Sequence, residues 1–130
     1  MQEPLWIKKP AVLQIHAREL SIDGGAPGVR DEGLLESALA RPLNTFAYDD
    51  QATLFDLAAD YAFGIARNHP FVDGNKRTAL LACEGFLFLN GYRVVSEKEE
   101  KYLMYIWIAA GQISQGEFTD WLKQRATPVK

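Results

Sequence analysis

The feature that most constrains the fold of this chain is a proline-containing loop between two long apolar segments. Residues 54–68 carry apolar side chains at the three- and four-residue spacing of a helix with a wide buried stripe. Residues 75–90 form a second, almost continuously apolar segment, and the Gly91 that follows suits the left-handed position after a helix. Pro70 cannot continue the first helix and disfavours the α conformation at His69. The sequence therefore predicts two buried central helices joined by a short loop.

Shorter helices are predicted before this pair. Apolar periodicity indicates one helix over residues 12–20 and another over 34–41, with Asp31 as the N-cap of the second. Pro42 is expected to end that helix, because the residue before a proline is pushed out of the α region. Apolar and polar side chains then alternate over residues 43–50, which favours a short extended piece or a small hairpin.

Two more helices are predicted after the pair, since Ser96 with Glu99 and Ser114 with Glu117 both have the spacing of a capping box. No internal repeat or interdomain linker is evident. We therefore expect an all-α bundle with at most a small β element, folded as a single domain over residues 1–130.

The composition is typical of a soluble globular protein, with 48% hydrophobic and 24% charged residues. The net charge of -3 argues against a broad nucleic-acid surface, apart from a local basic cluster at Lys76 and Arg77. The sequence shows neither a signal-peptide pattern nor an apolar run that would span a bilayer, so we expect a cytoplasmic protein without a membrane contact. The single cysteine, Cys83, cannot form an intramolecular disulfide and is expected to be buried.

The loop between the central helices, HPFVDGNKR from His69 to Arg77, holds more reactive groups than a turn requires. His69 is a candidate general base, because histidine exchanges protons near neutral pH. The alternative is a histidine that only stabilises the C-terminal end of the helix dipole. Asp73 is a candidate Mg²⁺ ligand, because Mg²⁺ takes few carboxylates and completes its shell with water and phosphate. Capping of a turn is an equally good interpretation of Asp73.

The remainder of the loop is suited to binding an anion. Gly74 and Asn75 allow successive backbone N–H groups to point into one concavity, although a plain turn is the alternative. Lys76 and Arg77 lie in the first turn of a helix, where cations oppose the positive end of the dipole, and a bound phosphate would make them favourable. Taken together, these residues indicate phosphoryl or nucleotidyl transfer.

Three other side chains receive no catalytic role. His16 is expected to be a surface histidine or one whose hydrogen bonds are satisfied internally. Phe71, inside the loop, is expected to anchor it in the core, and Tyr102 is expected to be core packing.

The loop resembles the Fic motif, written HPFx(D/E)GNxR. The segment GGAPGVRDEGLLESALARP and the helical frame from Ile7 to Arg125 resemble the death-on-curing (Doc) branch of the Fic/Doc superfamily. This resemblance implies a Fic-fold helical bundle with a β-hairpin flap, which maps to Leu43–Asp50. It also implies that His69 is the base that activates a target hydroxyl and that Asp73 is the Mg²⁺ ligand. The anion-binding loop is then made by Gly74, Asn75, Lys76 and Arg77.

Two positions separate the reactions of this superfamily. Nucleotidylating Fic enzymes carry a glycine at the position of Lys76 and a phosphate-binding arginine at the position of Leu80. In Doc-like members a lysine at this place goes with an inverted nucleotide, whose terminal phosphate faces the target. The resemblance therefore implies Mg²⁺-dependent phosphoryl transfer from ATP. Transfer of AMP and a non-catalytic Fic-fold binding module are the alternatives.

The same resemblance implies an acceptor and a partner. The acceptor would be a threonine of elongation factor Tu, whose phosphorylation arrests translation, and the chain would be the toxin of a toxin–antitoxin pair. An inhibitory (S/T)xxxE(G/N) helix is not evident, because Ser37–Arg41 and Thr119–Lys123 both lack the glutamate. Restraint by a cognate antitoxin (Phd-like) peptide is therefore expected.

Overall fold

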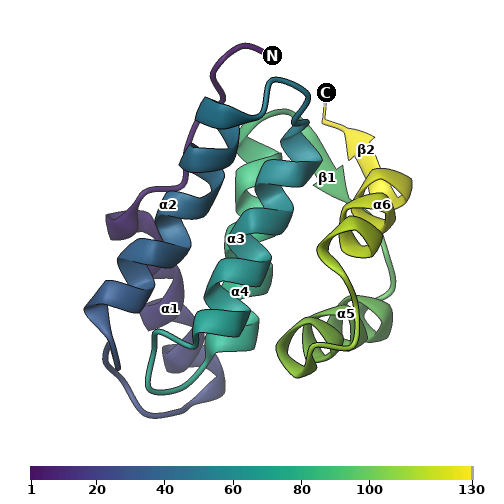
Figure 1. Ribbon diagram of the computed structural model, residues 1–130. Helices are drawn as coiled ribbons and strands as arrows, with labels where there is room; N and C mark the ends of the chain where they lie inside the picture. Colours follow the sequence, from purple (N-terminus) through teal and green to yellow (C-terminus); the bar gives the residue numbers. More distant parts are fainter. Residues whose placement is uncertain (130) are drawn as a thin grey trace.

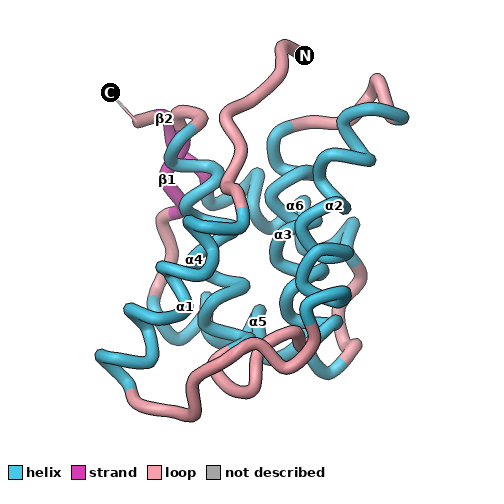
Figure 2. The backbone as a smooth tube through the Cα atoms, turned by 90° about the vertical axis from the view of Figure 1, so that its left-hand side faces the viewer, coloured by secondary structure: helices cyan, strands magenta, loops and turns pink. Residues whose placement is uncertain are grey.

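The computed structural model describes residues 1–129, which form a bundle of helices with one small sheet (Figures 1 and 2). The all-α class with a small β element is thus confirmed. Among these residues no helix is long and apolar enough to cross a membrane. In chain order the elements are α1 (Lys9–Asp23), α2 (Glu32–Tyr48), α3 (Leu54–Asn68), α4 (Asn75–Leu89), β1 (Tyr92–Val94), α5 (Lys98–Ala110), α6 (Gln115–Arg125) and β2 (Ala126–Pro128).

The predicted central pair is α3 and α4. Helix α3 packs against α2, α4, α5 and α6, and each of its residues from 57 to 66 is buried. It begins with a capping box between Thr53 and Asp56. It ends at Asn68 because His69, before Pro70, adopts the left-handed conformation with φ 53° and ψ 53°. The predicted end of this helix is therefore confirmed.

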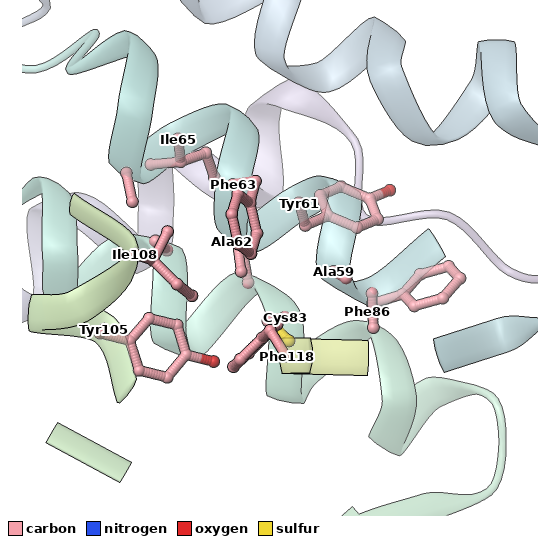
Figure 3. Packing of buried hydrophobic residues seen from close by; sticks show 14 of the residues in the cluster. Ala59, Tyr61, Ala62, Phe63, Ile65, Cys83, Phe86, Tyr105, Ile108 and Phe118 are labelled. Carbon is pink, nitrogen blue, oxygen red and sulfur yellow. The ribbon is translucent and has the colours of Figure 1, made fainter. Parts of the chain in front are cut away.

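Part of the core lies where α3, α4, α5 and α6 meet. Figure 3 shows Phe63, Cys83, Tyr105 and Phe118, one from each helix, gathered around one point. The ring of Phe118 lies 5.9 Å from that of Phe63 and 5.6 Å from that of Tyr105, measured between centroids. Aromatic pairs at such separations add to the stabilisation that comes from burial. The predicted burial of Cys83 is confirmed.

Two predictions about α2 are wrong. Pro42 lies inside the helix rather than after it, and the segment Leu43–Asp50, expected to form a flap, is helical to Tyr48. The helix continues because its buried face, which includes Leu35, Ala38 and Pro42 at successive turns, packs along α3. Tertiary packing offsets the hydrogen bond that the proline removes.

The small β element lies elsewhere. Strand β1 pairs antiparallel with β2 near the C-terminus, with Tyr92 opposite Pro128 and Val94 opposite Ala126 (Figure 1). The two strands are separated in sequence by α5 and α6, so they do not form a hairpin. Local alternation of side chains does not reveal a pairing over this sequence distance.

The predicted caps are confirmed at two of three helices. Asp31 accepts a hydrogen bond from the backbone of α2, and Ser114 with Glu117 forms the capping box of α6. The box expected at Ser96 is absent, because α5 begins one residue later, after Glu97, without a side-chain cap.

The loops at the end of the bundle opposite both termini lie side by side (Figures 1 and 2). One is the glycine-rich segment between α1 and α2, and the other is the loop between α3 and α4. Val29 forms an isolated antiparallel bridge with Phe71, and the backbone N–H of Val72 donates to the carbonyl of Gly28 at 3.0 Å. The predicted reactive loop is thus held against a second loop.

Candidate active site

The carbonyl groups of His69, Pro70, Phe71 and Asp73 accept hydrogen bonds from the surrounding protein. Arg30 donates from its side chain to the His69 carbonyl and from its backbone to the Pro70 carbonyl, both at 2.7 Å. Asn75 donates to the carbonyl of Phe71 and accepts from its N–H, each at 2.9 Å. Because the Asn75 side chain is buried, these two bonds fix the turn firmly.

In contrast to the loop carbonyls, the N–H groups at the start of α4 are available to bind a ligand. Gly74 is left-handed with φ 78°, and no side chain caps the helix. The first-turn N–H groups of Asn75, Lys76 and Arg77 have no acceptor within the helix. They lie at the positive end of the helix dipole, which is a ready site for an anion.

The carboxylate of Asp73 is held beside this helix start. Its Oδ1 accepts a hydrogen bond of 2.8 Å from the N–H of Gly74, and its Oδ2 lies 3.4 Å from the N–H of Ala26. A Cβ on Gly25 would lie 2.8 Å from the same Oδ2, so the glycine leaves room for the carboxylate. The glycine-rich segment, predicted only as a flexible loop, is therefore a wall of the site.

The predicted site residues all line one open cleft of about 470 Å³ at this end of the bundle. They are His69, Asp73, Gly74, Asn75, Lys76 and Arg77. Phe71 is fully buried below the cleft, as predicted. The cleft combines an exposed imidazole, a carboxylate, free N–H groups and two cations, a combination suited to a phosphate-bearing ligand.

Two acidic residues of the cleft were not predicted. Glu19 and Asp23 of α1 lie 3.4 and 3.3 Å from the guanidinium of Arg77. A hydrogen bond between these two carboxyl groups raises the pKa of Glu19. Their spacing of four residues places them on one face of a helix, but only the contact of α1 with α4 brings them to Arg77. Part of the negative charge expected near Arg77 therefore comes from the chain itself.

Lys76 and Tyr102 also line the cleft. Lys76 is exposed and forms no ion pair with the rest of residues 1–129, so its charge is available to a ligand. Tyr102, predicted as core packing, is 49% exposed and borders the cleft, because α5 turns Tyr105 rather than Tyr102 into the core.

His16 is a buried histidine with a satisfied hydrogen bond, one of the two alternatives predicted for it. Its Nε2 lies 2.8 Å from the carbonyl oxygen of Asp73. It therefore touches the loop although it does not line the cleft.

The helical bundle and the loop at the start of α4 are those of a known family. Residues 6–87 match the model of the Fic/DOC family, and the chain belongs to this family. It is 35% identical to "Protein kinase doc" of Escherichia phage P1 over 118 residues, which is 91% of this chain and 93% of the relative. It is 47% identical to "Toxin Doc" of Mycolicibacterium smegmatis (strain ATCC 700084 / mc(2)155) over 75 residues, which is 57% of this chain and 58% of the relative. The chain is thus similar to the Doc proteins of the family over most of its length.

Proposed function

We propose that this protein is a Doc-type toxin that transfers the γ-phosphoryl group of ATP to a protein hydroxyl in a Mg²⁺-dependent reaction. The observation that carries the proposal is Lys76 at the uncapped start of α4, with its charge free to face a terminal phosphate. The phage relative with 35% identity is named a protein kinase, which supports the same reaction.

Leu80 supports phosphoryl transfer over transfer of AMP. It lies about one turn beyond Arg77 and lines a hollow next to the cleft, together with Tyr102 and the charged residues Arg77, Lys98, Glu99 and Lys101. The enzymes that transfer AMP carry a second phosphate-binding arginine at this position. A leucine supplies no charge there, so the cations of the loop serve one phosphate end of the nucleotide rather than two.

In the proposed reaction, His69 accepts the proton of the acceptor hydroxyl. The hydroxyl oxygen then bonds to the γ-phosphorus while the bond from that phosphorus to the leaving ADP oxygen breaks. The N–H groups at the start of α4 and the Lys76 ammonium stabilise the charge on the transferred group. Arg77 joins them to the extent that phosphate oxygens compete with Glu19 and Asp23 for its guanidinium.

Asp73 is the residue that would hold Mg²⁺. Its carboxylate is already oriented by the N–H groups of Gly74 and Ala26, and each oxygen keeps further lone pairs. Within residues 1–129 no three His, Cys, Asp or Glu side chains gather as a metal site, so an ion here would complete its shell with phosphate oxygens and water. A site with one carboxylate fits Mg²⁺, which when bound to the nucleotide neutralises phosphate charge.

We further propose a threonine of elongation factor Tu as the acceptor, with arrest of translation as the result, and a cognate antitoxin peptide as the restraint. The resemblance to Doc proteins supports both, and the relative named a Doc toxin supports the restraint by an antitoxin. The cleft itself is open, with the exposed His69 at its wall, so a segment of a protein substrate has access to the base.

Label transfer tests the reaction. The protein is incubated with Mg²⁺, elongation factor Tu and ATP labelled at either the α or the γ phosphate. We expect γ label on elongation factor Tu, and loss of transfer by about 10²-fold or more in His69→Ala, because a general base contributes at least that much. Chelation of Mg²⁺ should also abolish transfer.

A second variant, His69→Asn, controls for the backbone. Asparagine tolerates the left-handed conformation of position 69, so a loss of activity in this variant does not come from backbone strain. Transfer of the α label would contradict the proposal in favour of AMP transfer. Absence of both labels from elongation factor Tu and from every protein of a cell extract, with unaltered growth on expression without antitoxin, would indicate a binding module.

A further inference from the structure

His16 occupies a position that simple packing does not require. The residue is 5% exposed, and its ring lies stacked on that of Phe71, with centroids 3.8 Å apart and an angle of 11° between planes. Its Nε2 is 2.8 Å from the carbonyl oxygen of Asp73. A carbonyl only accepts, so Nε2 must carry the proton and donate it. A buried polar ring is thus placed under the loop with its donor on one specific peptide group.

That peptide group joins Asp73 to Gly74, the N-cap residue of α4. The carbonyl of Asp73 and the N–H of Gly74 belong to the same rigid plane. The N–H donates to the Asp73 carboxylate, so the orientation of the plane also sets the position of the carboxylate. Among residues 1–129 the carbonyl has no hydrogen-bond donor other than His16. Arg30 and Asn75 hold the carbonyls of His69, Pro70 and Phe71, and His16 holds that of Asp73.

Gly74, the residue that follows this peptide group, makes the hydrogen bond from His16 necessary. Gly74 has no Cβ and populates a wide range of backbone conformations, so by itself it does not fix the plane. A Cβ on Gly74 would lie 3.7 Å from Nε2 of His16, which shows that the imidazole packs directly against the start of α4. Stacking on Phe71 holds the ring in that place.

We propose that His16 is a positioning residue for nucleotide and metal binding. It fixes the Asp73–Gly74 peptide, and thereby the Asp73 carboxylate and the free N–H groups at the start of α4, in the geometry that binds Mg²⁺ and phosphate together. This inference rests on the proposed function, because it assigns to His16 a role in the same site. It makes the hydrogen bond, rather than the burial of a ring, the important property of this side chain.

Two substitutions separate the hydrogen bond from the ring. His16→Phe keeps an aromatic ring that can stack on Phe71 but removes the donor. His16→Gln keeps an N–H₂ donor near the position of Nε2 but removes the ring. Val12→Ala is the matched control, because Val12 is a fully buried residue one turn earlier on α1, and its truncation destabilises the fold without touching the loop.

For each variant, the dissociation constant of Mg·ATP is measured by calorimetry and the unfolding midpoint by a thermal scan. We expect His16→Phe to bind Mg·ATP about 10- to 100-fold more weakly, the range typical of residues that hold a metal ligand in place. His16→Gln should recover most of the affinity. Val12→Ala should lower the unfolding midpoint and leave the affinity unchanged.

Three results would overturn the inference alone: wild-type affinity in His16→Phe, no recovery in His16→Gln, or an equal loss in Val12→Ala. Binding of Mg·ATP by the wild-type protein without transfer of the γ-phosphate would overturn the proposed phosphoryl transfer and leave the role of His16 standing. Failure of the wild-type protein to bind Mg·ATP would overturn both.

Discussion

At the scale of single residues, the site depends on how closely the two loops approach each other. Gly25 has φ +122°, and a Cβ built on it would lie 2.8 Å from Oδ2 of Asp73 and 2.9 Å from Cδ2 of Leu20. Neither separation is compatible with a real side chain, so an alanine would force these two side chains to move. The orientation of the Asp73 carboxylate therefore depends on a residue almost fifty positions away in the sequence.

Gly25→Ala is expected to weaken Mg²⁺ binding by about 10- to 100-fold, because it displaces the carboxylate proposed to hold the ion. The measurement is the Mg²⁺ concentration that gives half-maximal label transfer. Gly24→Ala is the matched control, since Gly24 also has a positive φ of +80° but has no neighbour within 4 Å of the added methyl group. An equal effect of both substitutions would show that backbone strain, and not the carboxylate, is responsible.

At the scale of elements, α2 and α3 approach closely at one point. A Cβ on Gly64 of α3 would lie 3.0 Å from the carbonyl oxygen of Ala38 and 3.1 Å from its Cα. The amide of Asn68, about one turn further along α3, donates to the carbonyl of Leu34 at 2.9 Å. The small residue and the hydrogen bond together hold α3 against α2 and fix the end of α3, from which His69 projects.

Two glycine substitutions test this helix contact. Gly64→Ala should lower the free energy of unfolding by about 1–3 kcal/mol, because the methyl group meets backbone atoms of Ala38. Gly85→Ala, in α4, should raise it by about 0.5–1 kcal/mol, because its methyl group meets only Cδ1 of Ile7 at 3.8 Å and alanine favours a helix. Urea denaturation gives both values. A higher free energy of unfolding in Gly64→Ala would mean that α2 and α3 move apart without loss of stability.

At the scale of the whole molecule, the core is one cluster of buried side chains that includes Cys83. The thiol lies where α3, α4, α5 and α6 meet and is fully buried (Figure 3). Burial raises the pKa of Cys83 to about 12. The folded protein therefore retains a proton that the unfolded chain releases near pH 9, so this thiol costs no stability below that pH. Its contribution to stability falls as the pH rises from about 9 towards 12.

Cys83 is therefore expected to report the opening of the whole core. At pH 8 a thiol reagent should not label the native protein, because the reactive thiolate is both scarce and inaccessible. In denaturant the same thiol should react fully, and the labelling curve should coincide with loss of helical circular dichroism. Rapid labelling under native conditions would show that the core opens locally around α4.

Much of the bundle and the loop at its centre could be predicted from the sequence, because the signals are local. Pro70 ends α3 through its own ring, Asp31 and Ser114 cap helices within three residues, and Gly91 takes the left-handed conformation after α4. The loop residues from His69 to Arg77 are contiguous, so the chain itself brings the candidate base, the carboxylate and the cations into one cleft.

The tertiary structure alone decided the features that depend on contacts between distant segments. Packing along α3 carries α2 through Pro42, where local sterics predict an end, and β1 pairs with a strand beyond two helices. The docking of α1 against α4 brings Glu19 and Asp23 to Arg77 and places His16 on the Asp73 carbonyl. The physical reason is that propensity acts over a few residues, whereas burial and ion pairing act between whichever surfaces the fold brings together.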